Sequence, residues 1–501
     1  MKKILLPALL ALIAIGLNAQ DMLPAEDISH RPHYFAGSKY PADRDSLEEF
    51  IINVMDINEP EFVNYEAIGL FAPFYDYDKS GKVLAKAYKY AADSLFDGVI
   101  IIGPAEHIDE KTVSIFKGES YTSPLGKSFV DSDAAQLLAG KNELYEYSNK
   151  GHISTKENAE FSIESQIPFI QKVFPDKPVI PVIVNELTFA ESRDLAVNIY
   201  EMAKETDKRY FIISTGNMYR SESFRLTRTS NIPILQILER NDYFTLANRL
   251  FAEDSPIKSP SPLITTMMAV SLTGGTGFFP VRYETVDIIN EKDTSFIGIA
   301  SAVSSRPTGD RDQFVPKPVI YGPDEVITLD HIREGISRVF TDDSIEQNSL
   351  IFRAVSEVFP FHAELYLNDI KITEYYDLFP SDHLSHTLPE VTYNALDKPG
   401  IREKLKEEDP KKYMIKLDIL SPLKLFRDFN RLNPSTGLSV RHKGELYSLM
   451  PDELNSELNN TEELIEIVNN KYGTNIQPNK IEDIYQFDVL RSLRSDQSDK
   501  E

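Results

Sequence analysis

The sequence contains no cysteine. This absence excludes disulfide bonds, thiolate metal sites, a cysteine nucleophile and the lipid-modified cysteine of a bacterial lipoprotein. Stability must therefore come from packing of the core. Gly-x-Ser-x-Gly, His-Glu-x-x-His and Walker-type runs are absent as well. The sequence thus gives no sign of the hydrolases and nucleotide-binding enzymes that carry these motifs.

Positive charge is scarce compared with negative charge. The chain has 53 Lys and Arg residues against 78 Asp and Glu residues, which gives a formal net charge of −25. Nucleic acids and anionic membrane surfaces attract clustered positive charge. We therefore expect neither as a partner, and the acidic composition is typical of a protein kept in solution by its charge.

Long apolar runs are absent except near the N-terminus. Lys2 and Lys3 precede an apolar stretch at Ile4–Leu17, and the residues up to Gln20 offer a small-residue cleavage site after Ala19. This pattern predicts a secretory signal peptide over residues 1–19, with an uncleaved N-terminal anchor as the alternative. The Met-Lys-Lys start is typical of bacteria. We expect export to the periplasm or the extracellular space, without membrane attachment beyond the signal peptide.

The first half of the chain alternates between two kinds of segment. Apolar, β-branched runs are separated by helical patterns, which predicts a largely parallel sheet with helices on both faces. The expected strands are Ala67–Ala72, Gly98–Gly103, Val179–Val184, Tyr210–Ser214, Gly277–Asp287 and Ser295–Ser304. The expected helices are Lys82–Leu95, Ile163–Val173, Ala190–Glu205 and Leu263–Leu272.

The composition of the sequence changes after residue 304, where a proline-rich segment of mixed charge indicates a linker. Further on, Lys411–Phe426 has the pattern of a strand, Gly437–Pro451 that of a hairpin about Lys443 and Gly444, and Glu453–Tyr472 that of a helix. The expected organisation is a signal peptide at 1–19, an α/β domain at 20–305, a linker at 306–325, an α+β domain at 326–490 and a disordered tail at 491–501.

The ends of the expected strands hold the candidate chemistry. In a parallel α/β sheet, ligands bind outside the carboxyl ends of the strands. The second strand runs into Glu106 and His107, and the first into Asp76 and Asp78. Divalent metals accept such oxygen and imidazole ligands, but about three must converge on one point. The residues alone leave three interpretations open: a solvated loop, the remnant of a ligand site, or an active metal site.

Several separated blocks, in one order, resemble the Memo family, also called AmmeMemoRadiSam system protein B. They are AGSKYPAD (36–43), APFYDYDKSGKVLAKAY (72–88), IIIGPAEH (100–107), YTSPLGKSFVD (121–131), FSIESQIPFIQ (161–171), FIISTGNMY (211–219) and TSFIGIASAV (294–303). The resemblance covers about residues 30–305. It implies the fold of class III extradiol dioxygenases, a central sheet with helices on both faces, and a metal-binding pocket of dioxygenase type.

The second half resembles protein A of the same system, which implies a fusion of the two components. The matching blocks are KYMIKLDILSPLKLF (412–426), GLSVRHKGELYSLMPDE (437–453) and IYQFDV (484–489). The protein A motif Leu-Arg-Gly-Cys-Ile-Gly is absent, so this domain is expected to be a degenerate version.

The chain departs from the family where the resemblance implies metal ligands. Histidines of the family correspond to Phe74, Glu106, Phe161 and Tyr219, and an aspartate corresponds to Gly216. His107 matches the second histidine of the family's Gly-Pro-Ser-His-His block. Phenylalanine cannot coordinate a metal, so the scaffold is kept while the ligands are replaced.

Our first hypothesis is therefore a non-catalytic protein that binds a small molecule or a protein partner, with no cofactor expected. An aromatic cleft with one acid and one imidazole suits an aromatic or amphipathic ligand. The residues expected to line it are Phe74, Tyr75, Glu106, His107, Phe161, Gly216 and Tyr219.

The second hypothesis is an enzyme of dioxygenase or hydrolase type with a rebuilt metal site. Asp76, Glu106 and His107 are its first candidates, and Asp78 could join them. Glu160 or Glu164, four residues apart and expected on one helix face, could complete an oxygen-rich set for Mn²⁺, Mg²⁺ or Ca²⁺. A third hypothesis is a structural role in which the two halves form an interface and the protein assembles.

Overall fold

The computed structural model describes residues 29–56, 65–153, 159–250, 257, 259–289, 294–307, 360–378, 401, 413–454 and 458–494. The expected signal peptide and all of the expected linker beyond residue 307 lie outside these residues. Within the described part of the chain, no helix combines the length and the apolar character needed to span a bilayer.

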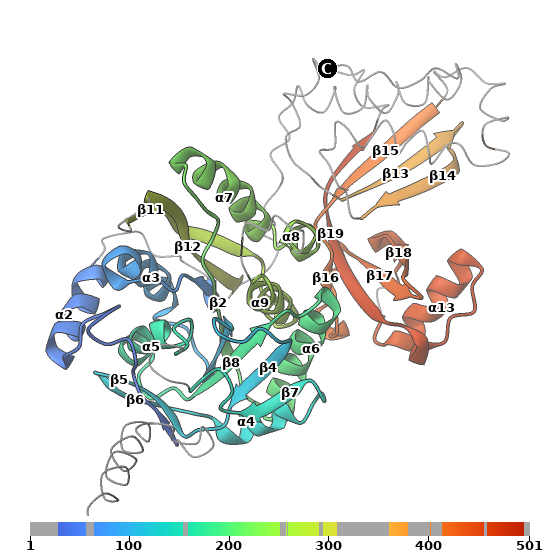
Figure 1. Ribbon diagram of the computed structural model, residues 1–501. Helices are drawn as coiled ribbons and strands as arrows, with labels where there is room; N and C mark the ends of the chain where they lie inside the picture. Colours follow the sequence, from blue (N-terminus) through green and yellow to red (C-terminus); the bar gives the residue numbers. More distant parts are fainter. Residues whose placement is uncertain are drawn as a thin grey trace, which may run out of the picture.

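A nine-stranded mixed sheet forms the centre of the first part (Figure 1). Its middle strands run parallel in the order β2 (Tyr65–Ala72), β9 (Tyr210–Thr215), β3 (Gly98–Pro104) and β8 (Val179–Asn185). These Val- and Ile-rich runs are buried almost throughout, as strands between two helical layers must be. The predicted strands are confirmed here.

The outer strands are not all parallel to the middle ones. β4 is antiparallel to β8, and β12 is antiparallel to β2. The largely parallel pairing that we expected holds for the centre of the sheet and for β4 with β7. Antiparallel neighbours need no helical crossover. The outer strands are β4 (Thr112–Phe116), β7 (Tyr145–Ser148), β10 (Arg220–Ser221), β11 (Phe278–Ile289) and β12 (Thr294–Pro307). A separate three-stranded sheet contains β1 (His30–Arg31), β5 (Ser120–Ser123) and β6 (Gly126–Phe129).

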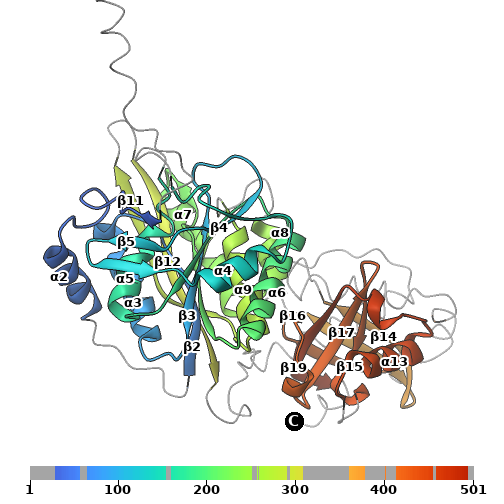
Figure 2. The ribbon, with the colours of Figure 1, turned by 90° about the horizontal axis from the view of Figure 1, so that it is seen from below.

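Helices cover both faces of the large sheet, as Figure 2 also shows. Side chains alternate along β3: Ile100 and Ile102 join one apolar cluster, and Val99 and Ile101 join the other. The first face is covered by α4 (Ser132–Ala139), α6 (Phe189–Glu205), α7 (Phe224–Glu239), α8 (Tyr243–Leu250) and α9 (Ser261–Leu272). The second is covered by α2 (Arg44–Met55), α3 (Tyr77–Ala91) and α5 (Ile167–Val173).

Helix α3 begins five residues earlier than the expected start at Lys82 and ends before Leu95. The difference depends on Gly81, which lies inside the helix and is buried against α2. A Cβ atom at this position would lie 2.6 Å from the ring of Phe50. Close packing of the two helices therefore requires glycine where propensity alone predicts a loop.

In the later part of the chain, the described residues form a seven-stranded sheet and one helix of twelve residues. The strand order is β14-β13-β15-β19-β17-β18, with β16 paired to β19. The strands are β13 (Phe361–Leu367), β14 (Ile370–Asp377), β15 (Tyr413–Leu420), β16 (Lys424–Leu425), β17 (Thr436–His442), β18 (Glu445–Leu449) and β19 (Asp483–Arg494), and the helix is α13 (Thr461–Tyr472). Single 3₁₀ turns lie at η2 (Glu164–Gln166), η5 (Phe429–Arg431), η6 (Pro451–Glu453) and η7 (Pro478–Lys480).

Three features of this part bear on the sequence predictions. The hairpin about Lys443 and Gly444 is confirmed, and both residues have positive φ angles of 53° and 80°, as a tight hairpin turn requires. α13 begins at Thr461 rather than Glu453, because Asn460 caps it by accepting a hydrogen bond from the Glu463 N–H at 2.9 Å. β19 continues to Arg494, into the segment expected to form the tail.

The two parts share an apolar cluster. Leu425 and Phe487 of the later part belong to the same cluster as the residues of α8 and α9. The Leu425 N–H donates to the Tyr243 hydroxyl at 2.6 Å. Arg193 on α6 donates to Asp483 at 2.8 Å. Packing and polar contacts therefore join the helices of the first part to the second sheet.

Candidate functional site

The expected site lies where β2, β3 and β9 end. These strands are parallel neighbours, so the segments that follow them meet at one edge of the sheet. The Gly216 N–H donates to the Ala72 carbonyl at 3.0 Å. The Asn217 side chain accepts from the Phe74 N–H at 3.2 Å and donates to the Phe74 carbonyl at 2.9 Å. Asn217 therefore clamps the segment after β9 onto the segment after β2.

Glu106, which follows β3, is tied to the chain that enters η2. Its carboxylate accepts a hydrogen bond from the Phe161 N–H at 2.6 Å. In return, the Glu160 carboxylate accepts from the Glu106 N–H at 3.2 Å and from the Ser162 N–H at 2.7 Å. Burial raises the pKa of Glu160, and the neighbouring charge of Glu106 raises it further. Both carboxylates thus accept hydrogen bonds from the backbone and hold these two segments together. Glu160 favours its protonated form.

Close approach of this segment to β3 depends on a glycine. Ser162 donates to the Pro104 carbonyl at 3.3 Å. A Cβ on Gly103 would lie 2.2 Å from the Ser162 hydroxyl oxygen. The Gly-Pro that ends β3 therefore lets the Ser162 segment pack directly on the strand.

The aromatic side chains at this edge are largely engaged in packing. Phe161 is buried, and its ring centroid lies 4.7 Å from that of Phe35. Phe74 is half-buried against the same apolar cluster. Tyr219 is half-buried, and its N–H donates to the Asn231 side chain at 3.0 Å. Tyr75 is half-buried, and burial raises its pKa, with a further contribution from the charge of Asp76.

The remaining candidates for metal ligands do not converge. Asp76, at the N-terminal end of α3, pairs with Lys39 at 2.6 Å. Asp78, Glu106 and His107 are exposed. Among the described residues, three His, Asp or Glu side chains with ligand atoms within 4.8 Å of one another occur at one place, which is not this edge. The residues present do not form the coordination set that the family resemblance implies.

The prediction that Glu160 and Glu164 share a helix face is wrong. Glu160 precedes η2, and α5 begins only at Ile167, where Pro168 occupies the first turn that favours proline. Glu164 is fully buried and pairs with the equally buried Arg31 at 2.6 Å. It also accepts from the Tyr40 hydroxyl at 2.7 Å and from two backbone N–H groups. Its carboxylate oxygens are thus engaged by partners within the protein and are not directed at a metal site.

Sequence reasoning missed the Arg31 network. Arg31 donates to the His152 carbonyl at 2.7 Å, and its guanidinium lies 4.7 Å from the Tyr121 ring centroid. It also donates to the Glu160 carbonyl. Arg31 lies in the two-residue strand β1, in a stretch of sequence without hydrophobic periodicity, so the sequence offers no local signal for its burial.

The group with converging ligand atoms lies in the second sheet. It consists of His362, Glu364 and Asp418, all buried. His362 Nδ1 lies 3.1 Å from Asp418 Oδ2. The Lys416 ammonium lies 3.2 Å from Glu364 and 3.1 Å from Asp418. A lysine thus already neutralises the carboxylates, and the group is an ion network. The alternation His-x-Glu on β13 and Lys-x-Asp on β15 is the signal that could have predicted it.

Comparison with known proteins finds a family and relatives that match the first part of the chain. The model of a family described as Memo-like protein matches residues 31–303. A MEMO1 family protein of Methanobrevibacter smithii is 26% identical over 279 residues, covering 54% of this chain and 97% of that protein. One from Desulfurococcus amylolyticus is 28% identical over 211 residues, covering 42% and 73%.

Two solved structures are also similar. An uncharacterized protein from Pyrococcus horikoshii is 15% identical with a TM-score of 0.25, covering 33% of this chain and 87% of its own. An uncharacterized protein from Escherichia coli K12 is 13% identical with a TM-score of 0.30, covering 46% and 98%.

Proposed function

The chain belongs to the Memo-like protein family, and from that premise we propose that it is a non-catalytic binding protein. Its ligand or partner would bind at the edge where β2, β3 and β9 end. The positions at which the family resemblance implies metal ligands carry Phe74, Phe161 and Gly216, which offer no ligand atoms. Phenyl rings and a hydrogen side chain cannot replace imidazole or carboxylate.

The observation that carries the proposal is the use of Glu106 at this edge. Its carboxylate accepts the Phe161 N–H at 2.6 Å and stands beside the protonation-prone Glu160. A metal bound by Glu106 would compete with this hydrogen bond, and the buried Glu160, which favours its protonated form, would be a poor second ligand. The pair is better suited to holding two loops together than to holding a cation.

The ligand class follows from the exposed and half-buried groups. Phe74, Tyr75 and Tyr219 supply aromatic surface, and Glu106 and His107 supply one acid and one imidazole. An aromatic or amphipathic molecule, or a protein segment with such a side chain, matches this combination. Binding screens with aromatic acids, sugars and peptides test the idea. A response that Tyr219→Ala abolishes would support it, and no response from the parent would leave only a scaffold role.

The competing hypothesis is an enzyme with a rebuilt site that uses Asp76, Glu106 and His107. The decisive measurement is the metal content of the protein from residue 20 onward after incubation with Fe²⁺, Mn²⁺, Cu²⁺ and Zn²⁺. Glu106→Ala and His107→Ala would be compared with His442→Ala, a control at a half-buried histidine in the later part of the chain. Stoichiometric metal that is lost in the first two variants and kept in the control would overturn our proposal.

One further variant separates the two parts of the chain in this assay. Asp418→Asn removes a carboxylate from the ion network of the second sheet. Metal that disappears only in this variant would lie outside the Memo-like part and would leave the binding proposal standing. No bound metal in the parent would remove the enzyme hypothesis and would leave the binding screens to decide between binding and a scaffold role.

Two finer proposals concern the rest of the chain. Residues 326–490 would be a degenerate domain of the protein A type, fused to a protein B type, on the strength of the blocks at 412–426 and 437–453. Residues 1–19 would direct export and be removed. N-terminal sequencing of the protein recovered from a bacterial periplasm or medium tests export: a start at Gln20 supports it, and retained Met1 contradicts it.

A further inference from the structure

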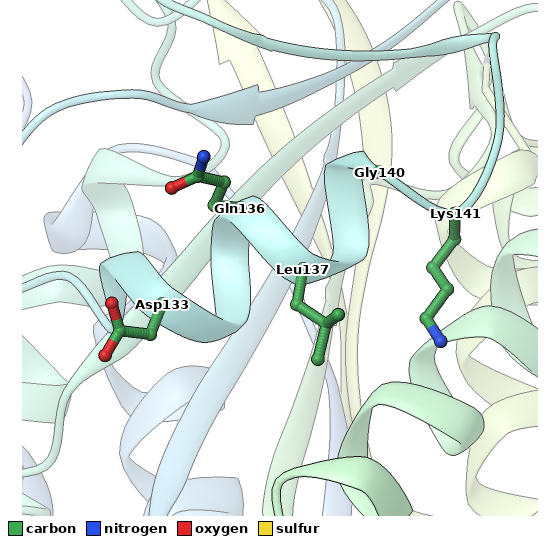
Figure 3. Close-up of a pocket in the computed structure, with 5 residues that line it drawn as sticks. All are labelled: Asp133, Gln136, Leu137, Gly140 and Lys141. Atoms are coloured by element: carbon green, nitrogen blue, oxygen red, sulfur yellow. The ribbon is translucent and has the colours of Figure 1, made fainter.

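A cleft of about 320 Å³ lies at the opposite edge of the large sheet from the expected site. It is lined by the first residues of β2 and β9, by the ends of α6 and α9 and by the turn before β3. Arg431 from the second part closes one side. Several separate elements therefore build its walls. A different hollow of about 470 Å³ lies along α4 (Figure 3), but α4 and the turn after it supply every lining residue.

The inner wall of the cleft is apolar. Phe96, Ile199 and Tyr200 line it and are themselves well packed, with 6%, 2% and 7% of their surface exposed. Leu95 also lines the cleft, and 68% of its surface is exposed. These groups offer an apolar surface that water covers at a cost.

The rim is cationic, although the whole chain carries a net charge of −25. Five Lys and Arg side chains line the cleft against two acids. These residues are Lys204, Lys208, Arg209, Arg306, Arg431, Glu66 and Asp207. A local excess of positive charge in an acidic protein attracts anions to this place rather than to the surface at large.

Within the described residues, two of the cations donate no side-chain hydrogen bond to a carboxylate. Arg306 forms two hydrogen bonds to Glu66 at 2.8 and 2.6 Å, and Lys208 pairs with Asp131 at 2.7 Å. Arg209 is 55% exposed and lies 3.9 Å from the same, already paired Glu66.

Lys204, the second of these cations, lies over the Tyr200 ring at 5.4 Å from its centroid. Within the described residues no carboxylate comes within 4.0 Å of its ammonium. Lys204 and Arg209 are therefore available to an incoming anion.

We propose that this cleft binds an amphipathic carboxylate, a molecule with an anionic head and an apolar body. The head would pair with Arg209 and Lys204, and the body would lie on Leu95, Phe96 and Ile199. A guanidinium binds a carboxylate through two parallel hydrogen bonds, and an apolar wall with a few placed charges is the usual form of a small-molecule site. The site is separate from the edge treated under the proposed function and does not depend on it.

The test is calorimetric titration of the full chain with decanoate, below its micellar concentration. Decanol, which lacks the charge, and butyrate, which lacks the apolar body, serve as matched probes. We expect saturable decanoate binding and at least tenfold weaker binding of both controls. Raising the salt concentration should weaken decanoate binding because exposed charge pairs are screened. Equal binding of decanol would overturn the proposal, as would the absence of saturable decanoate binding.

Variants locate the binding. The double variant Lys204→Glu with Arg209→Glu should weaken decanoate binding at least tenfold, and Leu95→Asp should do the same by removing apolar surface. Lys117→Glu, a reversal at an exposed lysine outside the cleft, should leave the affinity unchanged. Thermal melts of each variant confirm that it is folded.

Two results would give Lys204 and Arg209 a different role or place the ligand at a different site. Lower thermal stability of the double variant with unchanged decanoate affinity would mean that Lys204 and Arg209 serve the negative C-terminal end of α6. Loss of decanoate binding in Tyr219→Ala, with none in the cleft variants, would move the ligand to the other edge of the sheet. Either result overturns the proposal.

Discussion

Among the described residues, each part of the chain buries one histidine, and the surroundings of the two histidines shift their pKa values in opposite directions. In the first part, His152 lies beside the Tyr121 hydroxyl and the Ser114 carbonyl, near the charge of Arg31. Burial, together with the Arg31 charge, lowers the pKa of His152 to about 3. In the second part, burial alone would lower the pKa of His362, but Asp418 and Glu374 outweigh it and raise the pKa.

The comparison teaches that burial does not decide the charge of a side chain. Both imidazoles are fully buried by surface area. What differs is the sign of the groups around them: an arginine for His152, and several carboxylates for His362. The charges of the neighbouring side chains therefore decide the protonation state of each histidine: neutral beside Arg31, and favouring the protonated form beside the carboxylates.

The largest expected effect is loss of the cation in the first part. Arg31→Met leaves Glu164 buried without its partner, which typically costs about 3–5 kcal/mol. We expect a fall of this size in the free energy of unfolding, measured by urea denaturation. The double variant Arg31→Met with Glu164→Gln should recover much of the loss, because no unpaired charge then stays buried. A double variant as unstable as the single one would contradict this account.

The second expected effect is acid sensitivity of the first part. As the pH falls below 6.5, the unfolded chain protonates His152, whereas the folded chain does so only near pH 3. The unfolded state therefore binds more protons. As a result, the free energy of unfolding decreases as the pH decreases, by up to about 1.4 kcal/mol per pH unit. Urea midpoints at pH 7 and pH 4.5 measure the fall. His152→Gln should flatten this part of the profile, and an unchanged slope would show that other groups cause it.

The third expected effect is smaller and concerns the second sheet. Asp418→Asn removes a charged hydrogen-bond partner of His362, which costs about 2 kcal/mol. The pKa of His362 should fall, because Asp418 is the leading group that raises it. Two-dimensional NMR of the imidazole follows the titration. Asp452→Asn, at an exposed aspartate, is the matched control and should change neither quantity.

The smallest expected effect is the opposite pH dependence of the second sheet. A histidine with a raised folded pKa stabilises the protein fully below its unfolded pKa, and this contribution is lost as pH rises through the folded value. We expect His362 to contribute less stability at pH 9 than at pH 6. Comparing the parent with His362→Gln at both values isolates the contribution. A difference that grows with pH would remove the contrast between the two histidines.

The middle of the large sheet could be predicted because its strands are apolar on both faces. Runs such as Gly98–Gly103 are too short for a typical helix and rich in β-branched residues, which favours a buried strand. The short strands β4 to β7 and the eight-residue helix α4 were missed, since segments of four to eight residues carry too little periodicity. The start of α3 was missed because Gly81 is set by packing against Phe50, a contact that local propensity does not contain.

The location of the site could be predicted from the sequence, but its contacts could not. The sequence locates Phe74, Glu106 and Gly216 at strand ends, and the structure places them after β2, β3 and β9. The Asn217 clamp on Phe74 spans 143 positions of the chain, so no local pattern could reveal it. The backbone contacts of Glu106 and Glu160 are also long-range and required the folded structure.

The position of Arg31 sets a limit on how far the chain can be shortened. A recombinant form that starts at Ser29 keeps the contacts of Arg31 with Glu164 and His152. One that starts at Tyr40 would keep every strand of the large sheet, yet it would fold around a carboxylate with no counter-ion. Design of a minimal fragment should therefore be guided by this one side chain rather than by the first strand of the large sheet.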